Sequence, residues 1–75
     1  MDGRARRPVR VPDLNGMAAS EAAGLLREVG LRAGLVRLKF SREFDAGTVF
    51  DQEPAAAISV ERGQSVDLTV SSGLR

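Results

Sequence analysis

The sequence predicts an α+β fold, in which a single helix packs on a three-stranded β-sheet and a short additional strand precedes the helix (β-α-β-β-β). Three observations indicate this fold. Apolar residues recur at helical spacing in one stretch only, residues 18–29. Residues 35–40 and 64–71 alternate apolar and polar side chains, and residues 48–53 are interpreted as a further strand that ends at Pro54. Glycine and proline residues stand between these stretches, where the chain has to turn.

The predicted helix carries one apolar stripe, formed by Ala22, Leu25, Leu26 and Val29. Its N-terminal cap is weak, because Ala18 stands where a serine or threonine would satisfy a free backbone N–H, a loss of about 1 kcal/mol. Its C-terminal end is better defined. Gly30 can adopt the left-handed conformation that closes a helix, and Leu31 can make the accompanying apolar contact.

The alternation of the strands assigns their faces. One face of residues 35–40 is apolar and consists of Val36, Leu38 and Phe40. The opposite face consists of Leu35, Arg37 and Lys39. In residues 64–71 the expected inward side chains are Val66, Leu68 and Val70. We expect the core to form where Leu25, Leu26 and Val29 of the helix meet strand residues Leu38, Val49 and Leu68.

Two shorter segments complete the predicted domain. Residues 9–11 alternate apolar and charged side chains, which predicts a short edge strand before Pro12, a residue without a backbone donor. Residues 55–62 are interpreted as a connection, with Ile58 or Val60 folded beneath the sheet.

Composition argues against an enzyme. The chain has 75 residues, no cysteine and no histidine, so disulfides, thiolate metal sites and the commonest general base are all missing. Its serines have no histidine partner, its acidic residues are scattered singly, and no glycine-rich phosphate loop is present. We therefore expect no catalytic residues, no cofactor and no metal.

The N-terminal residues are basic. Residues 1–10 contain four arginines and one aspartate, a local charge of +3 in a chain of net charge +1. We interpret residues 1–8 as a flexible arm or linker, and the lack of interleaved aromatics argues against a nucleic-acid partner. No apolar run approaches the roughly 18 residues of a membrane span, and no export signal follows Met1. A minor alternative takes Met1 as a true start and the chain as a cytoplasmic protein whose arm contacts nucleic acid.

The turn residues form a frame with definite gaps. It begins with a Val-Pro-Asp-Leu-x-Gly segment at residues 11–16 and passes through Gly30 to a Gly-x-Val-x-x-Gln-x-Pro segment at residues 47–54. It ends with a Gly-x-x-Val-x-Leu-x-Val-Ser-x-Gly segment at residues 63–73. This order and spacing resemble the PASTA domain, a module named for penicillin-binding proteins and serine/threonine kinases. The resemblance assigns residues 9–73 to one PASTA-like domain, followed by a tail at residues 74–75. Its structural frame consists of Pro12, Gly16, Gly30, Gly47, Pro54 and Gly63.

The resemblance implies a non-catalytic binding or sensor module on the extracytoplasmic face of the bacterial membrane, within a larger anchored kinase or penicillin-binding protein. It implies peptidoglycan fragments as ligands, either muropeptides or β-lactam-like groups. The alternative is a structural spacer or dimerisation module without a small ligand, whose partners are other PASTA modules or a second copy. A membrane would be reached only through the parent chain. Ala57 departs from the family pattern, which usually has glycine there; a required positive φ would cost alanine roughly 1 kcal/mol.

The candidate ligand-binding residues lie on the exposed sheet face and in the loop that follows: Arg37, Lys39, Arg42, Phe44 and Gln52. The cations could hold the carboxylates of a peptidoglycan stem peptide, because arginine offers a bidentate fork. The structural alternative pairs Arg37 and Lys39 with Asp67 or Asp51 across the sheet.

Two of these candidates also have structural interpretations. Gln52 is favoured as a tie for the turn at Pro54, through backbone hydrogen bonds, over a ligand contact. Phe44 could contact a sugar or a partner, but we favour a role in covering the open edge of a small core. Because Val49 and Phe50 are adjacent on one strand, one of the two is expected to face solvent.

Overall fold

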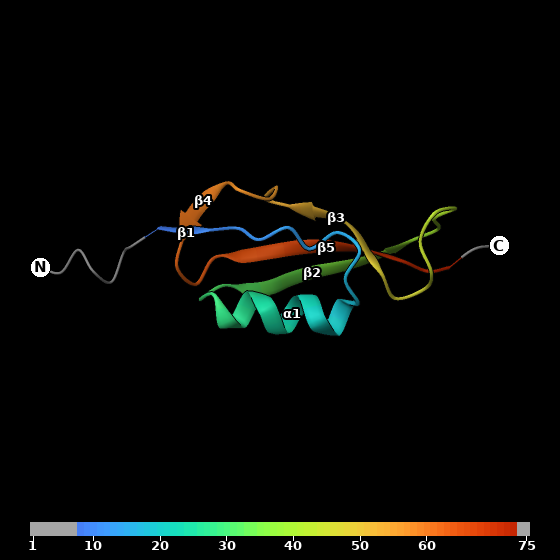
Figure 1. The fold of residues 1–75 in the computed structure, drawn as a ribbon, viewed down its shortest axis with the longest axis horizontal. Helices are drawn as coiled ribbons and strands as arrows, with labels where there is room; N and C mark the ends of the chain where they lie inside the picture. Colours follow the sequence, from blue (N-terminus) through green and yellow to red (C-terminus); the bar gives the residue numbers. More distant parts are fainter. Residues whose placement is uncertain (1–7, 74–75) are drawn as a thin grey trace, which may run out of the picture.

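The computed structural model describes residues 8–73, and the structural statements below concern this range. The chain forms one helix and five strands (Figure 1). In chain order these are β1 (Pro8–Arg10), α1 (Ala19–Glu28), β2 (Arg32–Lys39), β3 (Val49–Glu53), β4 (Ser59–Glu61) and β5 (Ser65–Ser71). The expected basic arm lies outside the described residues except for Pro8, and so does the expected tail at residues 74–75.

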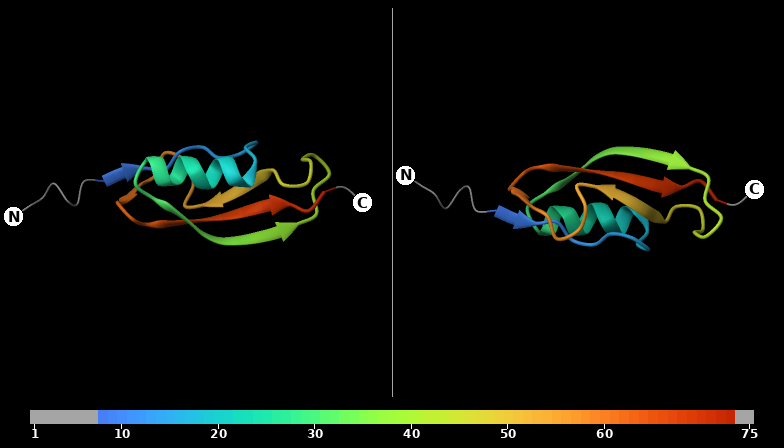
Figure 2. Two further views of the ribbon diagram at one scale, coloured as in Figure 1. Left: turned by 90° about the horizontal axis from the view of Figure 1, so that it is seen from below. Right: turned by 90° about the horizontal axis from the view of Figure 1, so that it is seen from above.

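The three longest strands form one sheet in the order β2-β5-β3. β2 runs parallel to β5, and β3 runs antiparallel to it. α1 covers one face of this sheet (Figure 2). The prediction of an α+β fold with one helix on a three-stranded sheet is therefore confirmed. Across residues 8–73, no helix is both long enough and apolar enough to cross a membrane.

One strand, β4, lies within the segment that the sequence predicts as a connection. It pairs antiparallel with β1 in a separate two-stranded sheet, where Val9 lies opposite Val60. β4 is three residues long, and its partner β1 lies about fifty positions earlier in the sequence, so no local pattern predicts the pairing. The short N-terminal strand itself is confirmed. Val60 packs against the core, whereas Ile58 is 49% exposed.

α1 ends as the sequence predicts. Gly30 has a φ of 94°, and the N–H groups of Gly30 and Leu31 donate to the carbonyl oxygens of Arg27 and Leu26 at 3.1 and 2.8 Å. This is a Schellman arrangement, which satisfies carbonyl groups that the helix end would otherwise leave free. At the other end, Ala18 occupies the N-cap position and makes no side-chain capping hydrogen bond. The weak N-terminal cap is therefore confirmed as well.

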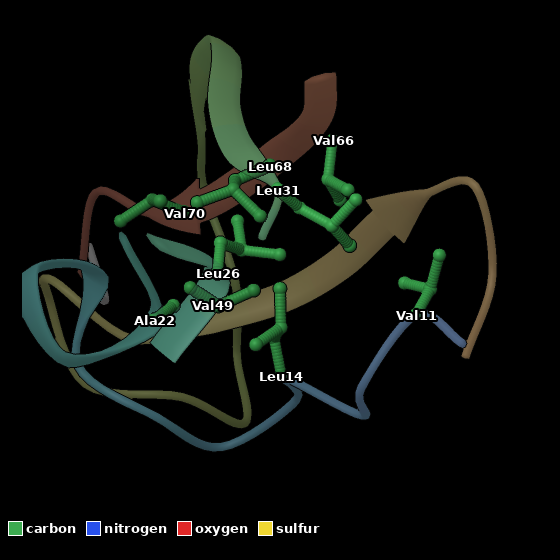
Figure 3. Packing of buried hydrophobic residues seen from close by; sticks show 9 residues of the cluster. All are labelled: Val11, Leu14, Ala22, Leu26, Leu31, Val49, Val66, Leu68 and Val70. Atoms are coloured by element: carbon green, nitrogen blue, oxygen red, sulfur yellow. The ribbon is translucent and has the colours of Figure 1, made fainter. Parts of the chain in front are cut away.

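The hydrophobic core lies between α1, the three-stranded sheet and the segment that precedes the helix (Figure 3). Its buried members are Val11, Leu14, Ala22, Leu26, Leu31, Val49, Val66, Leu68 and Val70. Leu26 belongs to this cluster together with Val49 and Leu68, as predicted. Leu25 and Val29 are partly buried and pack against it.

The prediction that Leu38 belongs to the core is wrong. Leu38 pairs with Val70 of β5, which places it on the helix side of the sheet, yet its side chain is 68% exposed. The reason is that the last part of β2 extends beyond the N-terminal end of α1 (Figure 2), so no element of the described chain covers that part of the face. Alternation along a strand specifies the face on which a side chain lies, but not whether another element packs there.

The segment before α1 contributes more to the core than the sequence indicated. Val11 is 1% exposed and Leu14 is fully buried, although both were assigned to an edge strand and a turn. This segment lies along the outer edge of β3. The N–H of Gly16 donates to the carbonyl oxygen of Val49, and the N–H of Val49 donates to that of Met17, both at 2.8 Å. The segment thus closes one edge of the sheet and buries its own apolar side chains.

The loop after β3 contains a strained alanine. Ala57 has a φ of 73° and is the one non-glycine residue between positions 8 and 73 with a positive φ. Its N–H donates to the carbonyl oxygen of Val11 at 2.8 Å, and the N–H of Val11 donates to that of Ile58 at 2.9 Å. These bonds hold Ala57 in a conformation that costs an L-residue about 1–2 kcal/mol. The peptide bond between Glu53 and Pro54 in the same loop is cis.

Candidate functional site

The sheet face opposite α1 carries charged side chains of both signs. Across this face, Arg37 of β2 lies beside Thr69 of β5, which in turn lies beside Asp51 of β3. In the neighbouring row, Asp67 of β5 pairs with Glu53 of β3. The face therefore changes from cationic at β2 to acidic at β3.

A hollow of about 230 Å³ opens on this face. Its lining consists of Arg37, Asp51, Gln52, Glu53, Asp67, Leu68 and Thr69. Arg37 is the one cation of this lining, and three carboxylates surround the rest of the hollow. Because neighbouring opposite charges on a sheet attract each other, a simple anion would compete with these carboxylates for Arg37. The hollow suits a ligand that carries both a carboxylate and an ammonium group better than it suits a simple anion.

Asp67 is held in place by the backbone of β2. One of its carboxylate oxygens, Oδ1, accepts a hydrogen bond from the N–H of Leu35 at 2.9 Å, where the β2–β5 register is irregular. Gly34 makes this approach possible, because a Cβ at position 34 would collide with the Asp67 carboxylate. The sequence predicts Asp67 as a possible ionic partner for Arg37 or Lys39, whereas the structure shows one of its oxygens bonded to the backbone of β2.

The other two predicted cations lie outside the hollow. Lys39 is the last residue of β2, pairs with Ser71 and is exposed. Arg42 is exposed in the loop that follows β2. The structure therefore brings Arg37 alone into the hollow, and the three predicted cations follow one another along β2 and its loop instead of forming one cluster.

Phe44 packs on Phe50 rather than on the main core. The two rings are stacked, with their centroids 5.7 Å apart and their planes 14° from parallel, and both side chains are half-buried. Hydrogen bonds fix the loop: the hydroxyl of Ser41 accepts from the N–H of Phe44 at 3.2 Å, and that of Ser71 donates to the Phe44 carbonyl oxygen at 2.8 Å. Val49 is buried and Phe50 is half-buried against Phe44, so Phe50 is the more exposed of that adjacent pair, but its ring is partly covered instead of facing solvent.

Gln52 is committed to contacts within the chain. Its side-chain oxygen accepts from the N–H of Leu14 at 2.8 Å, and its amide nitrogen donates to the carbonyl oxygens of Pro12 and Pro54 at 2.9 and 3.3 Å. The residue is 8% exposed. These bonds join the segment before α1 to the turn after β3, which agrees with the structural role favoured for Gln52. Although Gln52 lines the hollow, its amide has little capacity left for a ligand.

Glu53 also lines the hollow, although it is not among the site residues predicted from the sequence. The available signal was the spacing of Asp51 and Glu53, two residues apart on one strand and hence on one face. That signal could not be used without the strand order, which places β3 and β2 on either side of β5.

The rest of the described chain gives less indication of a binding site. Between residues 8 and 73, no group of three or more Asp, Glu, His or Cys residues is placed to hold a metal ion. A broad, open depression lies along α1, lined by Met17, Glu21, Gly24, Leu25, Arg27 and Glu28. None of the predicted site residues belongs to it.

Comparison with known proteins identifies the family. Residues 9–72, nearly all of the described chain, match the family model for the PASTA domain. The chain belongs to the PASTA-domain family. The resemblance carried by the turn residues is thereby confirmed.

The curated relatives are serine/threonine kinases. The PASTA domain is 42% identical over 69 residues to the probable serine/threonine-protein kinase PknB of Corynebacterium glutamicum, a match that covers 91% of this chain and 11% of the kinase. It is 36% identical over 66 residues to the serine/threonine-protein kinase PrkC of Bacillus subtilis, covering 87% of this chain and 10% of the kinase. The chain thus spans about a tenth of the length of these relatives.

Two solved structures from Staphylococcus aureus have the same fold. One is a three-PASTA-domain segment of a Ser/Thr kinase, with a TM-score of 0.83 and 27% identity, covering 89% of this chain and 33% of that structure. The other is the entire extracellular region of the Ser/Thr kinase PrkC, with a TM-score of 0.80 and 28% identity, covering 84% of this chain and 22% of that structure. These similarities confirm the predicted fold class, and they associate the module with extracellular regions of kinases.

Proposed function

We propose that this PASTA domain is a non-catalytic, extracytoplasmic binding module that recognises peptidoglycan fragments, within a larger membrane-anchored kinase or penicillin-binding protein. Two lines of support come from the family: the relatives are serine/threonine kinases, and one solved neighbour is an extracellular kinase region. The observation that carries the proposal is the hollow of about 230 Å³ on the outward sheet face, where Arg37 faces the carboxylates of β3 and β5.

The geometry suits a short peptide with charges of both signs. The Arg37 guanidinium can hold a carboxylate through two parallel hydrogen bonds. Lys39 lies two residues further along the same strand face, about 7 Å away, and can bind a second carboxylate. The carboxylates of Asp51 and Glu53, on the other side of the hollow, can accept from an ammonium group. A β-lactam-like group with one carboxylate would use Arg37 alone and should bind more weakly.

The loop beyond β2 offers a surface for the sugar part of such a fragment. The stacked rings of Phe44 and Phe50 are half-buried and form a flat apolar surface that a sugar ring can cover. Arg42, exposed in the same loop, is available for an additional anionic group. Peptide and sugar would thus contact different parts of the domain.

A titration tests the proposal. ¹⁵N-labelled domain is titrated with muropeptides that carry intact stem peptides, and amide chemical shifts are followed. Shifts should concentrate on β2, β3 and β5 around Arg37, and Arg37→Gln should weaken binding at least fivefold. The matched control is Arg27→Gln, which removes an exposed cation from the last turn of α1, away from this face. Muropeptides that move no amide resonance, or that bind the Arg37→Gln variant unchanged, would refute the proposal.

A second function, a spacer or dimerisation module without a small ligand, is favoured by a different observation. The solved neighbours include a segment with three PASTA domains, of which this chain covers 33%. β1 begins at one end of the domain and β5 finishes at the other (Figure 1), so copies joined in series would extend lengthwise. If this is the function, replacing the module in its parent chain by another domain of equal length should leave the parent's activity unchanged. Sedimentation of the isolated domain would reveal self-association.

A further inference from the structure

The exposed apolar side chains of this domain are concentrated at one strand. Between residues 8 and 73, five large apolar side chains are exposed, and four of them lie on β2 or directly after it: Leu35, Val36, Leu38 and Phe40, with exposed fractions between 48% and 68%. The fifth, Ile58, lies in the loop before β4. Leu35 lies on the opposite face from Val36, Leu38 and Phe40, but the last three share one face, and exposed apolar patches on a small domain mark surfaces that other molecules cover.

β2 also has an unoccupied edge. In the sheet order β2-β5-β3, β2 pairs with β5 on one side only, and the described chain supplies no strand for its other side. The opposite edge of the same sheet is treated differently. There, the backbone of Gly16 and Met17 bonds to Val49 of β3, and the side chain of Gln52 ties the adjoining segment down. The described chain thus closes the β3 edge of its sheet. The other edge, formed by the eight residues of β2, stays open.

An open, apolar edge normally attracts unwanted strands, and proteins protect such edges with inward-pointing charges, prolines or coverings. β2 has two protections of this kind, a register irregularity between Ala33 and Val36 and cations on its outward face. Its helix side, however, carries no charge where Val36 and Leu38 lie beside Leu68 and Val70 of β5. The charges of β2 all have one sign: Arg32, Arg37 and Lys39, with no acidic residue. A strand that complements this edge would place apolar side chains beside Val36 and Leu38, and acidic ones beside Arg37 and Lys39.

We propose that the β2 edge binds an extended, acidic segment of a partner protein, which adds to the sheet as a fourth strand. Backbone hydrogen bonds to the open edge would supply affinity, and the alternation of apolar and acidic side chains would supply specificity. The charge pattern disfavours a second copy of this domain at the same edge. Pairing of β2 with β2 would place the cations of one copy against those of the other, and like charges opposite each other destabilise a sheet.

The position of the edge is compatible with a chain of several modules. Because β1 begins at one end of the domain and β5 finishes at the other, modules joined in series would meet at these ends (Figure 1). The open edge of β2 runs along the side of the molecule in Figure 2, where a serial neighbour would leave it accessible. The proposed strand site lies at the edge of β2, whereas the hollow opens on the sheet face, but the two share Arg37, so a partner strand and a ligand of the hollow would compete for this side chain.

The probe is a seven-residue peptide in which four glutamates alternate with three β-branched apolar residues. Two control peptides accompany it: one with lysine in place of every glutamate, and one with its internal amides N-methylated, which can donate no backbone hydrogen bonds. Binding is followed by ¹⁵N amide shifts and by hydrogen exchange of the β2 amides. The acidic peptide should slow exchange of β2 amides at least tenfold and shift β2 resonances, and neither control peptide should do so.

Variants locate the site. The double substitution Val36→Gln, Leu38→Gln removes two exposed apolar side chains and should weaken peptide binding at least tenfold. The control Ile58→Gln removes another exposed apolar side chain, away from β2, and should leave binding unchanged. Thermal unfolding of each variant verifies that the fold is retained.

Four results would overturn the proposal: no binding of the acidic peptide at millimolar concentration, equal binding of the lysine peptide, shifts confined to α1 or to the β3 and β5 residues of the hollow, and a loss of peptide binding with Ile58→Gln equal to that of the double substitution. Self-association of the domain that the double substitution abolishes would also overturn it, because the occupant of the edge would then be a second copy.

Discussion

Replacing Ala57 by glycine should stabilise this domain, although most substitutions to glycine destabilise proteins. Ala57 has a φ of 73°, and its conformation is fixed by the hydrogen bond from its N–H to the carbonyl oxygen of Val11 at 2.8 Å. A left-handed conformation costs an L-residue about 1–2 kcal/mol, a cost that glycine does not have. The alanine side chain is exposed, so its removal sacrifices no burial.

The opposing effect is the greater freedom of glycine in the unfolded chain, which lowers stability by about 0.4–1 kcal/mol. The balance favours Ala57→Gly by about 0.5–1 kcal/mol. For a domain of this size, each kcal/mol moves the melting temperature by about 4–8 °C, so the expected increase is about 2–8 °C. This magnitude is large enough to measure by circular dichroism during heating, or by urea denaturation at 25 °C.

Ala55→Gly is the matched control, because Ala55 is exposed in the same loop and does not have a positive φ. There, only the effect on the unfolded chain remains, and the variant should lose about 0.4–1 kcal/mol. If Ala57→Gly lowers the melting temperature as much as Ala55→Gly does, the alanine at position 57 is not strained and the argument fails.

Three further predictions concern packing and hydrogen bonds. Gln52→Ala removes three hydrogen bonds and leaves the buried N–H of Leu14 without a partner, so urea denaturation should show a loss of about 3 kcal/mol; a loss below 1 kcal/mol would contradict the structural role. Gly34→Ala should displace the Asp67 carboxylate and thereby accelerate hydrogen exchange at the Leu35 amide. The control is Gly24→Ala, where the added Cβ meets open space on α1; it should leave exchange at the Leu35 amide unchanged and should not destabilise the domain. Leu26→Ala, at a fully buried position, should cost about 3 kcal/mol in the free energy of unfolding, and a cost comparable to that of an exposed position would mean that α1 does not pack as described.

The helix and the central strand could be predicted because their signals are local. The helical spacing of Ala22 and Leu26, the glycine at the helix end and the alternation of Val66, Leu68 and Val70 all reappear in the structure. Each of these features depends on residues within a few positions of one another. The turn residues likewise sufficed to indicate the family, because they restrict where the chain can reverse direction.

The candidate site could be predicted only in part. Arg37 does lie on an outward sheet face, as alternation indicates, but its acidic neighbours depend on which strand is adjacent to which. The hydrogen bonds of Gln52 to the backbone of Leu14 and Pro12 depend on a contact between segments that are far apart in sequence. Stacking of Phe44 on Phe50 depends on how the loop after β2 folds back.

By itself, the sequence determined the helix and its end at Gly30, the three longer strands and the stop of β3 before Pro54, since these follow from side-chain periodicity and from the backbone properties of glycine and proline. It did not indicate β4 or the first three residues of β2, which begins at Arg32 and not at Leu35. Only the tertiary structure decided which faces are covered. Leu38 illustrates the difference. Its place in the alternating pattern of β2 is that of a core residue, but α1 is too short to cover it, so its side chain is exposed at the open edge of the sheet. Coverage depends on the length and placement of a distant element, which no periodicity along one strand can encode.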